Sequence, residues 1–353
     1  MKKVSAAWLV AGISAMGLPG RSSGGEGPIR FPADAGIVDV TEYGAVPGDE
    51  FDDTEAIQAA LDTFPNGNRI VYLPPGTYRI SDTLRWPGGG ESAMQRRTIL
   101  QGAGEGETLL RLPEATAGFT DAVNPKPLIW TGGAPAQRYR NAIRDLAVEI
   151  GPGNAGAVGV QLAASGQGGM RRVTIRAAQG SGRIGLDLSH ADEIGPLLVK
   201  HLVVEGFETG IATKWPLNSN TFEHVHLAGQ RRQGWWNYHQ MVFVRDLVSE
   251  NRVPSLYNEK DSWGAVTLLG AHLHALRPEP GTPAILNQRQ MYLRDVEILG
   301  YPKGVDHDDR GREKGDIEGP GTVAEDTSHR EVRSLFREVG DGTFAEAGEV
   351  VHL

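Results

Sequence analysis

Cysteine is absent from the 353 residues, which excludes disulfide bonds and a lipid-anchoring cysteine. Positive charge is also scarce, since 35 lysines and arginines stand against 44 aspartates and glutamates, for a net charge of -9. A phosphate backbone demands a basic face, so the composition argues against nucleic acid as a partner. Packing and backbone hydrogen bonding alone must therefore hold the fold together.

A hydrophobic run of the roughly 20 residues that a membrane span needs is also missing. Lys2 and Lys3 precede an apolar run from Val4 to Leu18, and a loose segment rich in glycine and serine follows. This order is typical of a signal peptide, with a buried N-terminal helix or a membrane anchor as the alternatives. We expect residues 1–24 to be a signal peptide and linker, and the mature chain to be secreted or periplasmic without a membrane span.

Glycine and proline are plentiful, with 47 and 21 copies, and favour short strands joined by many turns. One pattern, in which two polar residues separate apolar positions, recurs at intervals of about 20 to 30 residues, the length of one coil of a parallel solenoid. We predict that its central residues are buried and stacked in one column. These residues are Leu146, Val173, Leu202, Val225, Leu247 and Val296.

A second short strand follows in most repeats, as in the segments GVQL, GLDL, GIAT, GWWN, SLYN and AILN. Asn237, Asn258 and Asn287 occupy equivalent positions in the last three of these segments. Stacked asparagine amides can hydrogen-bond from coil to coil at the strand spacing of about 4.8 Å. The pattern therefore predicts an asparagine ladder inside the solenoid.

Both ends of the solenoid need cover, because the first coil exposes strand edges and apolar core. The segment 51–64 predicts a short amphipathic helix with Asp52 or Asp53 as its N-cap. Residues 306–353 lack an apolar period through their charged first half and are predicted to form an extended or poorly ordered C-terminal strap.

Three segments, VTEYGAVPGDEFDDTEAIQAALD, RIVYLPPGTYRISDTL and TILQGAGEGETLLRL, resemble in order and spacing the N-terminal signature of the pectate-lyase-like superfamily. The resemblance covers about residues 37–112, is closest to the rhamnogalacturonase, epimerase and β-1,3-glucanase branch, and departs at Glu50, where glycine is usual. It implies an all-β fold, a single-stranded right-handed parallel β-helix over residues 37–305 with a short N-terminal capping helix. It also implies extracellular carbohydrate chemistry but supplies no catalytic residue, because the matching segment is the cap.

Outward side chains at equivalent positions of the coils should form columns along the axis. One predicted column holds Glu205 and Glu250 two coils apart with Ala228 between them, and His226 lies in the neighbouring column. Two strand spacings are roughly 9 to 10 Å, close to the roughly 6.5 to 9.5 Å that separates the carboxyl groups of inverting glycosidases. The hypothesis is that the two glutamates are acid and base and that His226 orients the water or holds a sugar hydroxyl. The alternative is that the glutamates are solvated surface charges paired with Arg176 or Arg245.

Aromatic and cationic side chains complete the predicted site on the same outer face. The GWWN segment should send Trp235 inward and Trp236 outward, and Trp236 and Tyr257 are candidate platforms for sugar rings. Arg176 and Arg245 are the candidate cations for substrate binding. The pairs His224 with His226 and His272 with His274 lack an identifiable third ligand, so no metal site is predicted. No cofactor is indicated: the acids of the segment 187–193 make calcium possible, but a polar loop explains them equally well.

The predicted partner is a polysaccharide or oligosaccharide, and the oligomeric state stays open. Because the chain is acidic, a polyuronide would need a basic groove or bridging calcium, and a neutral or weakly charged glycan is favoured. The sequence therefore predicts a glycoside hydrolase. A polysaccharide lyase or epimerase and a non-catalytic, adhesin-like glycan-binding β-helix are the alternatives.

Overall fold

The computed structural model describes residues 31–32, 34–88, 96–133, 138–215, 218–259 and 264–307, and the backbone of three C-terminal strands. The predicted signal peptide lies outside these residues. Met1–Ala35 and Gly36–Leu353 are two separate units, and all elements below belong to the second. No helix in the described ranges is long and apolar enough to cross a membrane.

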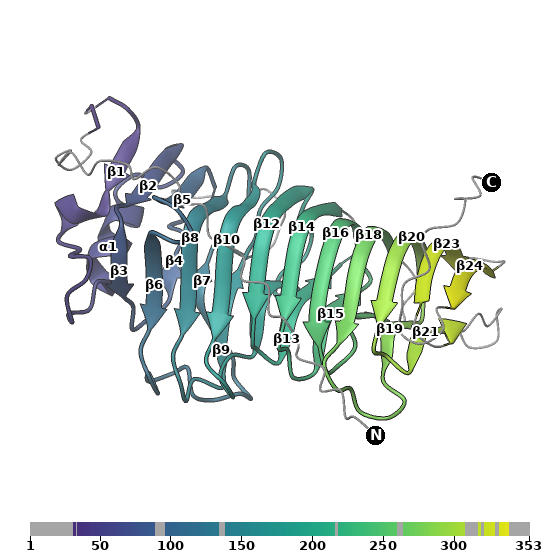
Figure 1. Cartoon of the computed structure of the whole chain (residues 1–353). Helices are drawn as coiled ribbons and strands as arrows, with labels where there is room; N and C mark the ends of the chain where they lie inside the picture. Colours follow the sequence, from purple (N-terminus) through teal and green to yellow (C-terminus); the bar gives the residue numbers. More distant parts are fainter. Residues whose placement is uncertain are drawn as a thin grey trace, which may run out of the picture. The chain divides into compact units, whose positions relative to one another are not determined.

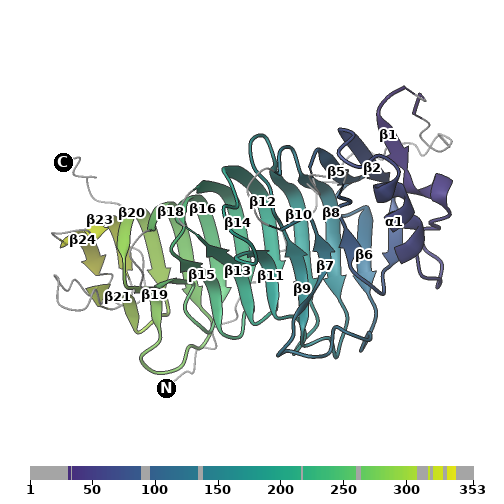
Figure 2. The same cartoon turned by 180° about the vertical axis from the view of Figure 1, so that it is seen from behind.

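The second unit is a solenoid of about nine turns, each giving one strand to a sheet called A here and one to a sheet called B (Figure 1). Sheet A contains the parallel strands β1 (Ile37–Asp39), β2 (Arg69–Leu73), β5 (Thr98–Gly102), β8 (Ala142–Ile150), β10 (Gly169–Ala177), β12 (Leu197–Glu205), β14 (Ser219–Ala228), β16 (Met241–Asn251), β18 (Ala265–Ala275) and β20 (Gln290–Leu299), with β3 (Gly76–Arg79) and β6 (Thr108–Leu112) beside its first strands. Sheet B contains the parallel strands β4 (Leu84–Arg85), β7 (Lys126–Trp130), β9 (Ala157–Gln161), β11 (Ile184–Leu188), β13 (Thr209–Lys214), β15 (Gln233–Tyr238), β17 (Leu256–Glu259), β19 (Pro283–Asn287) and β21 (Lys303–His307), which Figure 2 shows from behind. The predicted all-β, right-handed parallel β-helix is confirmed.

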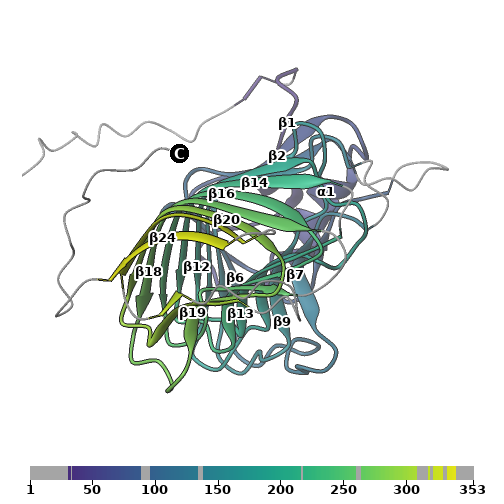
Figure 3. The same ribbon diagram turned by 90° about the vertical axis from the view of Figure 1, so that its right-hand side faces the viewer.

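Each long strand of sheet A from β8 to β20 bends at one residue in the left-handed backbone region, with φ between 51° and 66°. These residues are Asp145, Arg172, His201, His224, Asp246, Gly270 and Asp295. The bend divides sheet A into a first arm before it and a second arm after it. Seen along the coils, sheet A curves around the core while sheet B closes the other side (Figure 3).

The predicted core column is confirmed. Val173 pairs in register with Leu146 and Leu202, and the column continues through Val225, Leu247 and Val296. All six side chains are at most 1% exposed, and Ala271 fills the coil between the last two. A β-solenoid without disulfides is stabilised by this kind of continuous apolar stack between neighbouring coils.

The predicted asparagine ladder is also present and is fully buried. The amides of Asn237 and Asn258 are 2.9 Å apart, and those of Asn258 and Asn287 are 2.8 Å apart. Thr213 precedes the row at 2.7 Å from Asn237, and His307 follows it at 2.7 Å from Asn287. Each inner amide therefore has a side-chain partner on both neighbouring coils.

The N-terminal end is covered by the predicted short helix α1 (Thr54–Asp62) and by a second one, η1 (Val40–Tyr43), that the sequence did not predict. The Asp52 carboxylate accepts the Thr54 amide at 3.0 Å, and the Asp53 carboxylate accepts the amides of Val46 and Arg79. Burial raises the pKa of Asp53, and its two backbone donors oppose that shift. Both acids act as turn and cap residues, as the sequence suggested.

The C-terminal end changes strand direction. β22 (Ile317–Glu318) pairs antiparallel with β21, β23 (Gly321–Ser328) pairs antiparallel with β20, and β24 (Val332–Glu338) pairs antiparallel with β23. The described part of the predicted strap is therefore extended and continues both sheets, whereas the rest of it lies outside the described residues.

Candidate functional site

A pocket of about 390 Å³ lies on the outer face of sheet A, at the bend of strands β12, β14 and β16. Its lining residues are Glu105, His201, Leu202, Val203, His224, Val225, His226, Asp246 and Val248. Three histidines and two carboxylates thus meet at one hollow, above a floor of valine and leucine. Ionisable groups that share a pocket in this way are candidates for acid–base chemistry.

The bend explains why the histidines gather. His201 and His224 are the left-handed residues of two successive coils, so their rings lie one above the other, 4.6 Å apart between centroids and 5° from parallel. That separation matches the spacing of about 4.8 Å between neighbouring strands. His226 lies two residues beyond His224, in the outward column of the second arm.

Two of the histidines are held by carboxylates. His224 Nδ1 is 3.0 Å from Asp246 Oδ2, and His226 Nε2 is 3.0 Å from Glu250 Oε2. A carboxylate at one ring nitrogen keeps the proton there and leaves the other nitrogen of the neutral ring as a base. The pocket therefore contains two bases of opposite tautomer, Nε2 of His224 and Nδ1 of His226.

Desolvation lowers the pKa of His201, and the charges of Lys200, Arg172 and His224, when that ring is protonated, act in the same direction. A lowered pKa favours the neutral ring of His201, which can stack on His224 without repulsion between two charges. Glu105 closes the pocket from an earlier coil and accepts the hydroxyl of Thr174 at 3.4 Å. A further histidine–carboxylate pair, His272 with Glu297, lies on the same face beyond the pocket.

The predicted outward columns are confirmed by the strand register. Arg176 pairs with Glu205, Glu205 with Ala228, and Ala228 with Glu250, so the two glutamates lie two coils apart. Glu205 is exposed, and no hydrogen bond or ion pair reaches its carboxylate from the described residues. Glu250 instead holds His226, as a positioning partner.

Arg245 lies on the other side of the bend from the glutamates. It is exposed on the first arm of sheet A, with its Nε 3.8 Å from the Asp246 carboxylate. Arg176 is exposed on the second arm beside Glu205. Both predicted cations are therefore on sheet A, and their roles stay predictions.

The prediction that Trp236 and Tyr257 share this face is wrong. Trp236 lies in β15 and Tyr257 in β17, which are neighbouring strands of sheet B. Trp236 donates its indole N–H to Glu259 at 2.5 Å and stacks on Tyr238, and Tyr257 donates its hydroxyl to Gln288 at 3.1 Å. These half-buried aromatics form a separate outer surface, whereas Trp235 is buried in the core as predicted.

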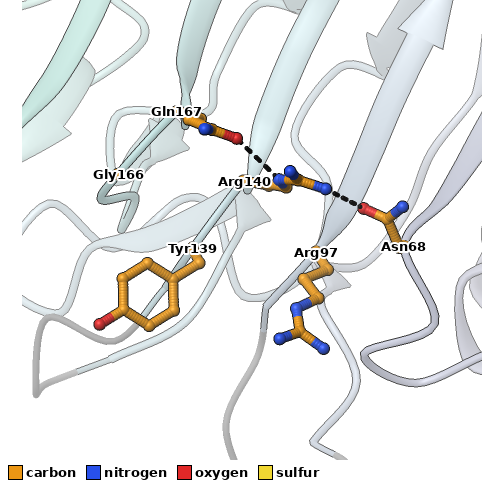
Figure 4. A pocket seen from close by; sticks show the side chains of 6 residues that line it. All are labelled: Asn68, Arg97, Tyr139, Arg140, Gly166 and Gln167. Atoms are coloured by element: carbon orange, nitrogen blue, oxygen red, sulfur yellow. Dashed lines mark hydrogen bonds between the residues drawn. The ribbon is translucent and has the colours of Figure 1, made fainter.

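Sequence reasoning missed a second hollow, at the turns that lead into sheet A (Figure 4). A pocket of about 540 Å³ is lined by Asn68, Arg97, Tyr139, Arg140, Gly166 and Gln167. A smaller one of about 180 Å³ is lined by Ala142, Arg144, Gln167, Gly168, Gly169, Met170, Arg171 and Leu198. The two share Gln167 and are called the arginine trough here.

No group of three or more histidine, cysteine, aspartate or glutamate side chains in the described ranges is arranged to hold a metal ion. The loop after β11, whose acids suggested calcium, is closed by its own hydrogen bonds. Asp187 accepts the Ser189 amide at 2.7 Å and the Gln161 amide nitrogen at 3.0 Å.

Stacked coils around a buried amide ladder, with an acid–base pocket on an outer sheet face, define a right-handed parallel β-helix protein. A family model described as "Rhamnogalacturonase A/epimerase, pectate lyase-like" matches residues 37–253, which is more than half of the chain. The chain belongs to this family, and the resemblance noted at residues 37–112 is thereby confirmed.

Among curated proteins, the mannuronan C5-epimerase AlgE3 of Azotobacter vinelandii is 41% identical over 80 residues, which cover 22% of this chain and 4% of that protein. Alginate lyase 7 of the same organism is 40% identical over 80 residues, 21% of this chain and 8% of that protein. The chain thus matches less than a tenth of either relative. The crystal structure of an iota-carrageenase from A. fortis superimposes with a TM-score of 0.51 at 11% identity, covering 76% of this chain and 57% of that one, which shows the fold alone.

Proposed function

We propose that the protein acts on a polysaccharide by moving a proton at the sugar carbon next to a carboxylate, as a lyase or an epimerase. The observation that carries this proposal is the pair of histidine–carboxylate contacts at one pocket, His224 with Asp246 and His226 with Glu250. The relatives named as an epimerase and an alginate lyase support the same class of reaction.

The proposed reaction begins with His224, whose Nε2 takes the proton from the carbon bearing the carboxylate while Asp246 stabilises the imidazolium that forms. The electron pair moves into the carboxylate as an enediolate, which the imidazolium of His224 stabilises. In elimination, that pair returns to form a carbon–carbon double bond, the glycosidic C–O bond breaks, and the leaving oxygen takes the Nδ1 proton of His226. For this role His226 must enter the reaction as an imidazolium, with its Nε2 proton held by Glu250. In epimerisation, His226 instead returns a proton to the same carbon on its opposite face.

Replacing each histidine by glutamine tests the proposal. His224→Gln and His226→Gln should each lower turnover of a uronate polymer by about 10²- to 10⁴-fold, because each removes one proton carrier. Ultraviolet absorbance of unsaturated products reports the lyase, and deuterium incorporation from heavy water, read by NMR, reports the epimerase. His274→Gln, on the same face but outside the pocket, is the matched control and should retain parental turnover. Full turnover by both pocket variants would overturn the proposal.

A second candidate is the hydrolase predicted from the sequence, with Glu205 and Glu250 as acid and base. The register favours it, since Ala228 leaves space for a water between the two glutamates. This candidate predicts new reducing ends without unsaturated product, and it predicts that Glu205→Gln abolishes turnover while His224→Gln does not. The two candidates therefore give opposite patterns in one assay.

We also propose that the protein is exported to the periplasm or the medium, where a polysaccharide is accessible. The charge and apolar order of residues 1–24 support this. N-terminal sequencing of the protein recovered from those fractions tests it, because a processed chain begins beyond the apolar run.

A further inference from the structure

The arginine trough collects positive charge that carboxylates do not neutralise. Neither of its two pockets is lined by an aspartate or glutamate in the described part of the chain. Elsewhere on sheet A the cations have acidic neighbours, such as Arg111 with Glu149 at 2.8 Å and Lys200 with Glu223 at 2.8 Å. The chain as a whole has a net charge of -9, whereas the lining of the trough is positively charged.

Neutral amides hold the central arginine in place. Arg140 donates from Nε to Gln167 Oε1 at 2.8 Å and from Nη1 to Asn68 Oδ1 at 3.3 Å (Figure 4). Amide oxygens fix the guanidinium plane but leave its charge uncompensated, and its remaining N–H groups can serve a ligand. A guanidinium oriented in advance is suited to bidentate binding of an oxyanion.

The neighbouring arginines repel one another. Arg144 and Arg171 are register partners on adjacent strands, with backbones about 4.8 Å apart. Burial, followed by the charge of Arg171, lowers the pKa of Arg144. The Asp145 carboxylate opposes this shift, but it already forms an ion pair with Arg172. An anion placed between Arg144 and Arg171 would relieve this repulsion.

The backbone of the trough is strained in the same place. Asn68, Arg97, Arg140 and Gln167 precede sheet A in four successive coils, and all have φ between 58° and 70°. The left-handed conformation costs a residue with a side chain energy that its surroundings must offset, and such strain gathers at ligand sites.

We propose that the arginine trough binds the oxyanion groups of an acidic polysaccharide, and so holds the polymer at a subsite separate from the histidine pocket. The ligand is a chain whose sugars carry carboxylate or sulfate groups, in place of the neutral glycan that net charge favoured. The inference rests on the proposed function only for the polymeric nature of the ligand. The geometry on its own supports the binding of oxyanions.

The inference is tested by measuring the binding of three polymers to the full chain. Polygalacturonate carries carboxylate groups, a sulfated galactan carries sulfate groups, and a β-glucan is neutral. Calorimetry at two salt concentrations should give affinity for one or both acidic polymers that falls with salt, and none for the β-glucan. Arg140→Gln with Arg144→Gln should weaken binding by about tenfold or more for each arginine. Arg294→Gln, in the same column as Arg144 but 3.5 Å from the Asp295 carboxylate, is the control and should bind as the parent does.

Arg97→Gln guards against loss of folding, because the Arg97 side chain forms no hydrogen bond or ion pair with the other described residues (Figure 4). This variant should also weaken binding. Parental affinity in the double variant or equal affinity for the β-glucan would overturn the inference. Saturation by inorganic phosphate without any polymer binding would overturn it as well. His224→Gln should retain polymer binding, because it leaves the trough intact. If the trough variants bind the polymers as the parent does while the histidine variants lose turnover, this inference is wrong and the proposed reaction stands.

Discussion

Asn258 occupies the centre of the buried amide ladder, where it bonds to Asn237 on one coil and Asn287 on the next. Asn258→Ala should lower the free energy of unfolding by about 2 to 4 kcal/mol, because it leaves buried polar groups on both neighbours without a partner. Chemical denaturation measures this loss. Asn124→Ala, which removes an exposed amide 2.8 Å from Asp121, is the matched control and should change stability by less than about 0.5 kcal/mol. Equal stability of the two variants would show that the ladder is dispensable.

At this scale the sequence revealed residues whose role follows from position within a strand, such as Asn237 at the end of GWWN. It could not reveal that the rings of His224 and His226 have different neighbours. Residues two apart share one side of a strand only where the strand is straight. His224 has a φ of 56° and bends the strand, which turns its ring toward His201 and Asp246. Arg97 and Arg140 lie in turns, where apolar and polar residues follow no regular alternation from which the direction of a side chain could be predicted.

Four glycines near the start of successive sheet B strands are register partners and form one column. They are Gly159, Gly185, Gly210 and Gly234. A Cβ on Gly185 would lie 2.3 Å from Val204 Cγ1 and 2.8 Å from the Gly210 carbonyl oxygen. Gly185→Ala should therefore destabilise the fold by about 1 to 3 kcal/mol, since a backbone carbonyl cannot move aside without shifting the next coil.

Thermal unfolding measures that effect. Gly106→Ala is the control, because nothing lies within 4 Å of its Cβ position, and it should unfold near the parental temperature. An unchanged midpoint for Gly185→Ala would mean that neighbouring coils separate more easily than their hydrogen bonds indicate.

The side of each long strand that faces the core was predictable, because apolar and polar residues alternate along the strand. Apolar residues such as Leu202 and Val225 were therefore expected to point inward. Alternation does not tell which outer face an outward residue occupies. Trp236 and Glu205 are both outward, yet β15 belongs to sheet B and β12 to sheet A, because a turn separates the two strands of each coil. The direction of such turns depends on backbone angles that the apolar pattern does not encode, which is why the predicted site was divided.

The whole solenoid ends in antiparallel strands, with β23 on the edge of β20 and β24 on the edge of β23. A chain ending at residue 307 would leave the long edge of β20 unpaired, and exposed edges pair with other chains. Light scattering after gel filtration should show larger species for this truncation than for the full chain. A chain ending at residue 338 keeps β23 and β24 and should elute as the full chain does. Identical elution of all three chains would mean that the antiparallel strands protect no edge.

The amide ladder inside the solenoid also has a polarity. Asn237 and Asn258 each donate from the amide nitrogen to the amide oxygen one coil closer to the C-terminus. The second hydrogen of each asparagine in the row reaches a backbone carbonyl, that of Gln240, Gln290 or Arg289, which fixes the orientation of the amide. The row ends on Nδ1 of His307, a buried ring that must lack a proton at this nitrogen to accept the last bond. A proton on that nitrogen would set a donor against a donor, so the direction of the ladder also selects the tautomer of a single imidazole at its far end.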